Sequence, residues 1–414
     1  MVDPALTAAG TPAVPDRPKP RPVAMLTHSY YEEDPRVRRE AESLLAAGRP
    51  VEVFSLRRPG DEPEGVVDGV RVHRLDVQRH QGASLAVYMG EYLAFFVRAA
   101  WSLLRAHARR RYALVQVHTL PDFLAFAVLP LRVAGVPVLL DLHEAMPEFF
   151  RSRFPRAANP LVHQALLLQE RLSIGAATHA ITVNDALGKR LIRLGVPKDK
   201  VSIVINSPSL IRFDPSRYPR RGFAWDGTVR LVYAGALTPT YELDVAIDAV
   251  ARLAERRPEL PVAFEVYGRG DSEPGLRAQV ERLGLGDRIT FHGRIPLEDV
   301  PAVIAAADIG LAPTRRDKFT DVSLSTKIFE YGAMGRPAVA SRLPLVERTF
   351  PPGTVTTYPP GDANALATAI LHLVDDPGAR DAAVGRTGRR VRDLGWEREA
   401  ERYVALVDRL AGGA

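Results

Sequence analysis

Short apolar runs alternate with segments of helical periodicity along nearly the whole chain from residue 22 onward. In the first half, apolar runs predict buried strands at residues 23–27, 51–56, 114–118, 136–143, 180–183 and 201–206. Residues 69–77 instead alternate between apolar and polar positions, which is typical of an edge strand. Asp34 and Pro35 supply an N-cap and a first-turn proline for a helix that runs to Gly48. Apolar strands separated by helices predict a parallel sheet covered on both faces.

A segment without clear periodicity interrupts this alternation at residues 206–227. It is rich in proline, arginine and glycine, which predicts an interdomain linker. The alternation then restarts, with strands predicted at residues 229–235, 262–268, 289–293, 309–313 and 337–341. Helical patterns at residues 362–375, 380–394 and 396–410 follow. The chain therefore reads as α/β, with two doubly wound, Rossmann-like domains in tandem.

These patterns divide the chain into four parts. We predict a disordered leader at residues 1–21, a first Rossmann-like domain at 22–207, a second Rossmann-like domain at 208–395 and a terminal helix at 396–414. The leader is rich in alanine and proline and lacks the apolar run of a signal peptide, so we expect a cytoplasmic protein.

The longest apolar stretch, residues 85–104, contains Glu91 and Arg98. Two charges within about twenty residues argue against a membrane-spanning helix and favour a long core helix. A basic amphipathic face that touches a membrane is the less favoured alternative.

Composition narrows the class of protein. A chain of 414 residues is long enough for two domains, and it contains no cysteine, so disulfides and thiolate chemistry are excluded. The net charge is +6 and most basic residues are arginine, which suits anionic substrates. An arginine-favouring, GC-rich genome explains this composition equally well. Basic and aromatic residues are not interleaved as in proteins that stack nucleic-acid bases, so we expect no nucleic-acid partner.

The most informative segment lies between Ser323 and Ser341. It reads as a polar loop, a short helix, a Gly-Arg-Pro stop and a buried strand. A loop that enters a helix at Ser325-Thr326-Lys327 offers backbone N–H groups, hydroxyls and a cation to an anionic ligand. Glu330 follows one turn later, where it can accept hydrogen bonds from sugar hydroxyls. A capped helix with a solvated glutamate is the alternative interpretation.

Ionisable residues also gather where other strands end. His118 and the Asp141–Glu144 cluster close apolar strands, although a single histidine there is usually a satisfied core residue. Two histidines at matching strand ends favour a role in a cleft between the two sheets. In the second domain, cations lie on or near the carboxyl-end loops, at Arg269, Arg294, Arg315, Arg316, Lys318 and Lys327.

Several nucleotide-binding motifs are absent. The loop after the first strand, residues 28–34, contains no glycine, so a dinucleotide fingerprint is missing. No Gly-x-x-x-x-Gly-Lys loop and no Asp-x-Asp metal clamp occur, and the histidines show no zinc-like clustering. We predict no metal and no cofactor.

The chain resembles the family 4 retaining glycosyltransferases, also called glycosyl transferases group 1, which have the GT-B fold. The most specific match is Lys327-Ile-Phe-Glu330 followed by Gly335-Arg-Pro337. Further segments follow the order and spacing of the family, at residues 34–48, 204–206, 233–237, 266–270, 291–295, 307–313 and 360–362 and at the helix that begins with Trp396. In the family, that last helix crosses back to the first domain. The resemblance also implies that residues 22–207 form the acceptor-side domain and residues 208–395 the nucleotide-sugar-binding domain.

The resemblance implies a role for each matching residue. Glu330 would bind the nucleotide ribose, the amides of Ser325–Lys327 the diphosphate, and the backbone at Arg294 and Ile295 the base. His143 would lie beside the transferred sugar. We therefore expect His143, Lys327 and Arg269 as catalytic residues. The expected donor-binding residues are Gly235, Arg294, Ile295, Ser325, Thr326, Glu330, Asp321, His118, Glu144 and Arg315.

Three positions depart from the family pattern. Val322 replaces the first acid of the usual Glu-x7-Glu pair, with Asp321 one place away. Ala236 and Tyr241 replace the usual arginine and lysine after the first strand of the second domain. The cations for the leaving group must then come from Lys327, Arg269 or residues 315–318.

The resemblance implies retaining transfer of a sugar from a nucleoside diphosphate of the UDP or GDP type. We expect a small-molecule acceptor, in secondary-metabolite or glycoconjugate biosynthesis, and no metal. Three alternatives remain open: a peripheral-membrane transferase acting on a lipid carrier, a sugar-nucleotide epimerase and a non-catalytic sugar-nucleotide-binding protein.

Overall fold

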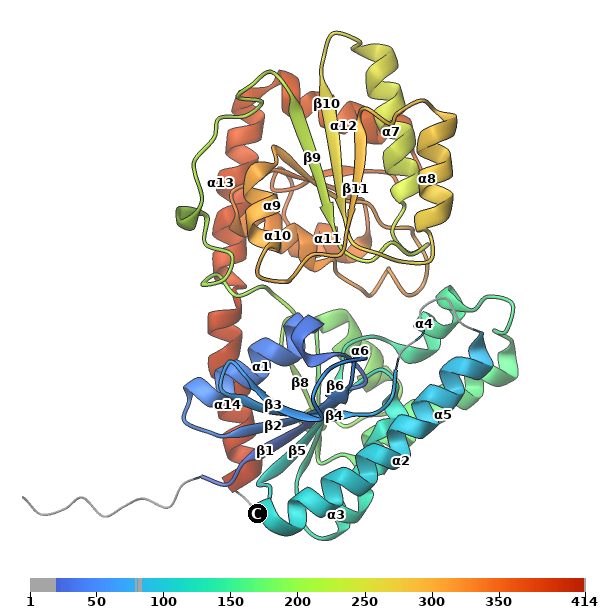
Figure 1. Ribbon diagram of the computed structural model, residues 1–414, viewed down its shortest axis with the longest axis vertical. Coiled ribbons are helices and arrows are strands. Elements are labelled where there is room, and N and C mark those ends of the chain that lie inside the picture. Colours follow the sequence, from blue (N-terminus) through green and yellow to red (C-terminus); the bar gives the residue numbers. More distant parts are fainter. Residues whose placement is uncertain (1–19, 79, 81–83, 413–414) are drawn as a thin grey trace, which may run out of the picture.

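The computed structural model describes residues 20–78, 80 and 84–412. The strands form one eight-stranded and one six-stranded sheet, each in its own domain, and the two domains are stacked along the long axis of the molecule (Figure 1). The predicted leader lies almost entirely outside the described residues. The predicted fold class, two doubly wound α/β domains, is confirmed.

The N-terminal sheet has the strand order β3-β4-β2-β1-β5-β6-β7-β8. Its strands are β1 (Val23–Leu26), β2 (Val51–Leu56), β3 (Glu64–Val67), β4 (Val70–Leu75), β5 (Leu114–His118), β6 (Val138–Leu142), β7 (His179–Thr182) and β8 (Val201–Ile203). All neighbours pair in parallel except β3 and β4. The prediction of an edge strand at residues 69–77 is therefore wrong, because β4 is covered by β3 through a tight turn at Asp68 and Gly69.

Helices cover this sheet and connect its strands. They are α1 (Pro35–Ala46), α2 (Leu85–Arg110), α3 (Leu129–Val133), α4 (Met146–Arg153), α5 (Pro160–Ala176) and α6 (Asp185–Arg193), with the 3-10 helix η2 (Asp122–Val128) between β5 and α3. Helix α1 begins as predicted, with the Asp34 carboxylate accepting from two backbone N–H groups and Pro35 in the first turn. Within the described residues, no helix combines the length and apolarity needed to cross a bilayer.

The C-terminal sheet has the order β11-β10-β9-β12-β13-β14 and all its strands are parallel. Its strands are β9 (Val229–Ala234), β10 (Val262–Tyr267), β11 (Ile289–Gly293), β12 (Ile309–Ala312), β13 (Ala338–Ser341) and β14 (Thr356–Tyr358). Strand β14 was not predicted, because three residues are too few to show a period. The helices of this domain are α7 (Leu243–Arg256), α8 (Glu273–Arg282), α9 (Val300–Ala306), α10 (Thr326–Ala333), α11 (Pro344–Thr349), α12 (Ala363–Asp375) and α13 (Pro377–Asp393).

The last helix, α14 (Trp396–Gly412), returns to the N-terminal domain and packs against α1 and β5 (Figure 1). Trp396 and Tyr403 are buried in the same core cluster as strand β1. The Trp396 indole N–H donates to the Ser43 hydroxyl at 2.9 Å, and the Tyr403 hydroxyl donates to Gln116 at 2.6 Å. Helix α14 is therefore part of the core of the N-terminal domain.

Candidate active site

The loops at the facing ends of the two sheets enclose one cavity of about 1320 Å³. From the N-terminal domain it is lined by residues that follow β1, β5 and β6, including His28, Thr119 and His143. From the C-terminal domain it is lined by residues that follow β9, β10, β11 and β12, including Gly235 and Thr314. The carboxyl ends of both parallel sheets thus meet at one site, as expected of open α/β sheets.

The N-terminus of α10 opens into this cavity. Ser325 is its N-cap residue, yet no side chain caps the helix, and the Ser325 hydroxyl is buried without a hydrogen-bond partner. Ser325, Thr326 and Lys327 all line the cavity. Uncapped N–H groups at a helix N-terminus attract anions because they need acceptors and carry the positive end of the helix dipole.

Lys327 supplies a cation beside these amides. The residue is buried, and its ammonium lies 4.9 Å from the ring centre of Tyr233 and 4.2 Å from that of Tyr241. It forms no ion pair with an acidic side chain of the described chain. Gly235 leaves room for this lysine, because a Cβ atom at that position would lie 2.5 Å from Lys327 Cε.

Glu330 lies one turn further along α10 and also lines the cavity. Burial raises the pKa of Glu330, while the charge of Lys327 and a hydrogen bond from Thr326 act in the opposite direction. A carboxylate in this position can accept hydrogen bonds from ligand hydroxyls that replace the water it lost on burial.

Two further glycines let the loops after β9 and β10 pack closely. A Cβ atom on Gly268 would lie 1.8 Å from the Gly235 carbonyl oxygen, and one on Gly270 would lie 2.1 Å from that of Leu237. Arg269, between them, is exposed and lines the cavity. Its side chain makes no hydrogen bond or ion pair with any described residue, so its guanidinium is available to an anionic ligand.

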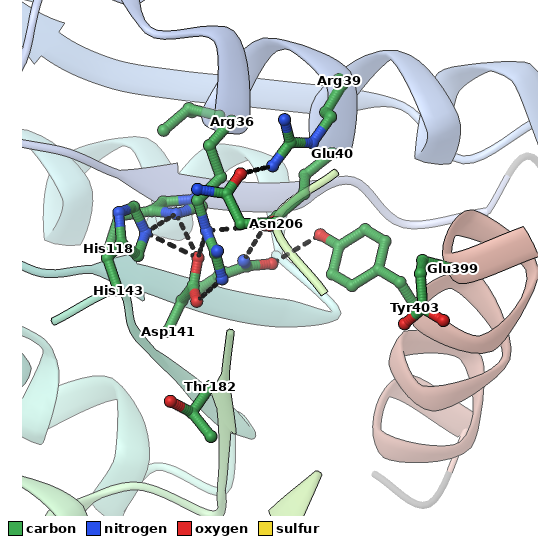
Figure 2. Close-up of polar contacts among 12 residues, drawn as sticks. Arg36, Arg39, Glu40, His118, Asp141, His143, Thr182, Asn206, Glu399 and Tyr403 are labelled. Atoms are coloured by element: carbon green, nitrogen blue, oxygen red, sulfur yellow. Dashed lines mark hydrogen bonds and ion pairs between the residues drawn. The ribbon is translucent and has the colours of Figure 1, made fainter. Parts of the chain in front are cut away.

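On the side of the cavity formed by the N-terminal domain, the buried carboxylate of Asp141 binds several surrounding side chains (Figure 2). Asp141 Oδ2 lies 2.8 Å from His143 Nε2 and 2.9 Å from His118 Nδ1, and the Arg36 guanidinium binds both carboxylate oxygens. Burial would raise the pKa of Asp141, but the charge of Arg36 and the two histidines hold it well below its usual range. His143 lines the cavity. Burial lowers the pKa of His143 and so favours its neutral ring.

The same network continues away from the cavity toward α14. Arg36 pairs with Glu40 at 3.3 Å, and Gln116 links Glu40 to Tyr403 through hydrogen bonds of 2.6 Å each. Burial, together with the charge of Asp141, raises the pKa of Glu40 to about 7. A continuous line of polar contacts therefore connects the cavity wall to the last helix (Figure 2).

His118, Asp141 and His143 offer ligand atoms that lie within 4.8 Å of one another, close enough to hold a metal ion. The Arg36 guanidinium already binds both oxygens of Asp141, so a metal ion here would compete with a bound cation. The prediction of a metal-free site stays a prediction.

The remaining predicted site residues fall into two groups. Glu144, Arg294 and Ile295 line the cavity, but the Arg294 guanidinium pairs with Glu33 of the other domain. Three predicted donor-binding residues do not line it. His118 is fully buried behind His143, Arg315 bonds Ser152 and Asp317, and Asp321 pairs with Arg316 near the surface.

The sequence interpretation missed the tyrosine pair beneath Lys327 and the role of Arg36. Tyr233 and Tyr241 are eight residues apart on different elements, so no local pattern joins them. Arg36 lies in the segment that resembles the family, but its partner Asp141 is distant in sequence. The Val322 carbonyl, at the position of the family's first acid, accepts from the Asn184 amide at 2.9 Å.

Several polar contacts cross between the domains around the cavity. Arg38 bonds Glu298 at 2.6 Å, and Arg153 bonds Asp271 at 2.5 Å. The Ser152 hydroxyl donates to Asp317 at 2.7 Å. Since these contacts join the rims of the two domains, they hold the cavity in a closed arrangement.

Two facing doubly wound domains with an uncapped helix N-terminus at the cavity between them are the architecture of the GT-B fold. The sequence profile "Glycosyl transferase 4-like domain" matches residues 34–207, and "Glycosyl transferases group 1" matches residues 228–376. Together these profiles cover well over half of the chain. The chain belongs to the group 1 glycosyltransferases, and the predicted family is confirmed.

Individual relatives are distant. The chain is 26% identical over 389 residues to a D-inositol 3-phosphate glycosyltransferase of Pseudarthrobacter chlorophenolicus, covering 91% of this chain and 90% of that protein. It is 25% identical over 259 residues to an alpha-D-kanosaminyltransferase of Streptomyces kanamyceticus, covering 60% of this chain and 64% of that protein.

Solved structures share the fold. A sucrose-phosphate synthase of Thermosynechococcus elongatus superposes with a TM-score of 0.77 at 20% identity, covering 95% of this chain and all of that one. Anabaena HepE in complex with UDP and glucose superposes with a TM-score of 0.69 at 15% identity, covering 94% and 99%.

Proposed function

We propose that this glycosyltransferase transfers a sugar from a nucleoside-diphosphate sugar to a hydroxyl of a small polar acceptor, with retention of configuration and without a metal. The observation that carries the proposal is the uncapped N-terminus of α10, which presents its amides, Lys327 and Glu330 to the interdomain cavity. This set matches the chemistry of a nucleoside diphosphate, whose phosphates need N–H donors and whose ribose needs an acceptor.

The amides and cations would act mainly on the leaving group. As the anomeric bond loosens, negative charge develops on the β-phosphate, and fixed N–H groups with a nearby ammonium stabilise it. Lys327 and Arg269 are the cations that replace the two lost at Ala236 and Tyr241. No group in the cavity is required as a covalent nucleophile, so we propose that the phosphate itself helps to deprotonate the acceptor.

Neutral His143 would position the transferred sugar. Asp141 fixes the orientation of its ring through the bond to Nε2, which leaves Nδ1 for a ligand contact, while the backbone N–H of His143 donates to the Thr119 hydroxyl. Closure of the domains would exclude water and limit hydrolysis of the donor.

The names of similar proteins suggest which donor nucleotide and which kind of acceptor to test first. HepE has been solved with UDP and glucose, so UDP is the first nucleotide to test. The name of the D-inositol 3-phosphate glycosyltransferases gives a small phosphorylated inositol as their substrate. The N-terminal side of the cavity, with His28, Ser29 and Tyr92, suits a polar acceptor of that size.

The test is thermal stabilisation of the protein by UDP, GDP, TDP and ADP. We expect one nucleotide to raise the melting temperature of the wild type and to have little effect on Glu330→Ala. Asp321→Ala is the matched control, because it removes a carboxylate from the same region that does not line the cavity. If no nucleotide stabilises the wild type, the donor-site assignment is wrong.

Measuring consumption of the donor sugar distinguishes a transferase from an epimerase and from a non-catalytic binding protein, all of which would share this binding site. Donor consumption only in the presence of an acceptor supports a transferase. Conversion of the donor sugar without any acceptor indicates an epimerase. Binding without consumption, across a panel of polyol acceptors, indicates a non-catalytic sugar-nucleotide-binding protein.

A further inference from the structure

The outer side of helix α2 carries apolar side chains that no described part of the chain covers. On its inner side, Phe95 and Leu103 are fully buried in the core. On the opposite side, Leu93, Val97 and Trp101 are 61%, 59% and 68% exposed. Residues four apart share one face of a helix, so these side chains form a continuous stripe. A helix that is apolar on opposite sides is normally covered on both.

Helix α5 carries a second stripe of the same kind. Leu161, Leu168 and Leu172 are 83%, 58% and 54% exposed, and their spacing places them on one helical face. Helices α2 and α5 both pack against η2, and both lie on the outer flank of the N-terminal domain (Figure 1). The two stripes therefore belong to one region of the surface.

The exposed charges in this region are all basic. Among the described residues from 77 to 175, none of the acidic side chains is exposed. Exposed arginines without an ion pair stand at Arg98, Arg105, Arg109, Arg132, Arg156 and Arg171. Apolar stripes flanked by unpaired arginines complement a surface that is apolar below and negatively charged above.

We propose that α2 and α5 dock this protein on the surface of an anionic lipid bilayer. The leucine, valine and tryptophan side chains enter the boundary between headgroups and acyl chains, while the arginines contact lipid phosphates. A second copy of the chain fits this face less well. Twofold pairing through it would bring arginines against arginines, and neither helix offers an exposed carboxylate to meet them.

The docking face adjoins the mouth of the interdomain cavity. Tyr88 and Tyr92 line the cavity, and Leu93 follows directly on the same turn of α2. A docked molecule would hold its cleft close to the membrane. Lipid binding itself does not depend on the proposed sugar transfer, so the two can fail independently.

The fluorescence of Trp101 tests the docking directly. The chain has three tryptophans, of which Trp396 is buried and Trp225 is exposed in the linker. In a Trp225→Phe background, we expect Trp101 emission to shift to the blue and to be quenched by brominated acyl chains in vesicles of phosphatidylcholine with phosphatidylglycerol. Vesicles of phosphatidylcholine alone, or high salt, should give little change. Unchanged Trp101 emission with the anionic vesicles would overturn the proposal.

Two double variants, measured by co-sedimentation with vesicles, distinguish the contribution of the apolar side chains to membrane binding from that of the arginines. Leu93→Gln with Val97→Gln should weaken binding at least about tenfold, because two apolar side chains no longer enter the bilayer. Arg98→Gln with Arg105→Gln should weaken it by about fivefold for each arginine.

The matched controls replace exposed residues elsewhere. Ile211→Gln and the pair Arg282→Gln with Arg389→Gln should bind vesicles like the wild type. Equal losses in the controls and in the α2 variants would refute a specific face. Light scattering tests whether a second copy of the chain occupies this face instead. A wild-type dimer that becomes monomeric in the variant Leu93→Gln with Val97→Gln would make the face a subunit interface and would contradict the proposal.

Discussion

Two histidines beside Asp141, on the N-terminal side of the cavity, have pKa values that their surroundings shift differently. Burial alone would lower the pKa of His118, but the hydrogen bond to Asp141 and the charge of that carboxylate raise it above the usual value. Burial lowers the pKa of the neighbouring His143. Two histidines that share one carboxylate are thus shifted in opposite directions.

This contrast predicts opposite pH dependence for two variants. A raised folded-state pKa means that charged His118 stabilises the fold fully below about pH 6.5, and that this contribution is lost as the pH rises through the folded pKa. The loss of unfolding free energy in His118→Asn should therefore be larger at pH 6 than at pH 9. His143→Asn should show the reverse trend. Urea unfolding at both pH values measures each difference, and parallel trends would contradict the assignment.

Gly235 allows a second prediction at this scale. In Gly235→Ala the new methyl group would meet Lys327 Cε at 2.5 Å and Nζ at 2.7 Å, so the ammonium must move from its place over the tyrosines. We expect nucleotide affinity, measured by calorimetry, to fall by about tenfold or more, since a hydrogen bond to a charged group contributes about 1.5–3 kcal/mol. Gly275→Ala, where the added methyl meets open space, should leave affinity unchanged. Equal nucleotide affinities in both variants would mean that Lys327 does not contact the bound nucleotide.

Residue-level features were only partly accessible from the sequence. Ser325, Lys327 and Glu330 lie within six residues, so a local motif could place them together on α10. The pairing of Arg294 with Glu33 depends on tertiary structure and that of Arg316 with Asp321 on the path of an irregular loop, so no spacing rule reveals which cations already have a partner.

At the scale of elements, α14 joins the end of the chain to the N-terminal core. The indole of Trp396 is 4% exposed, lies beneath the Arg39 guanidinium at 4.8 Å and packs near Tyr403. Glu397 further accepts from the Ser209 hydroxyl and the Leu210 N–H, both at 2.9 Å, so α14 also holds the linker.

Trp396→Ala should therefore destabilise the protein by about 3–5 kcal/mol, the usual cost of truncating a large buried aromatic side chain. Chemical denaturation followed by circular dichroism measures the loss. Trp225→Ala is the control, because that side chain is 57% exposed and its removal should change stability little. A similar small effect for both would mean that α14 contributes little to the stability of the N-terminal domain.

The sequence predicted most elements because apolar runs of parallel strands and amphipathic helices are long enough to show their periods. It failed for β3 and β14. Glu64–Val67 contains a glycine and an exposed Val66, and Thr356–Tyr358 is only three residues long. Such short strands are defined by pairing with a neighbour, which a local pattern does not contain.

For the molecule as a whole, the relation between the two domains decides whether the cavity excludes water. The rim contacts Arg38–Glu298 and Arg153–Asp271 join the domains on either side of the cavity. Their carboxylates are partly exposed, so each pair contributes at most about 1 kcal/mol to the closed arrangement. Two pairs together can shift the balance between open and closed forms by up to about thirtyfold. These two ion pairs alone are therefore too weak to lock the two domains in the closed arrangement.

A variant that combines Glu298→Gln with Asp271→Asn should open the cavity more often. If the proposed transfer is correct, water then reaches the donor more easily, so donor hydrolysis should rise relative to transfer while the melting temperature changes little. Small-angle scattering should show a larger radius of gyration in the presence of nucleotide. Glu255→Gln with Glu259→Gln removes two exposed ion pairs within the second domain and should leave both quantities unchanged. An unaltered ratio of hydrolysis to transfer in the rim variant, with unaltered scattering, would show that closure depends on contacts other than these two ion pairs.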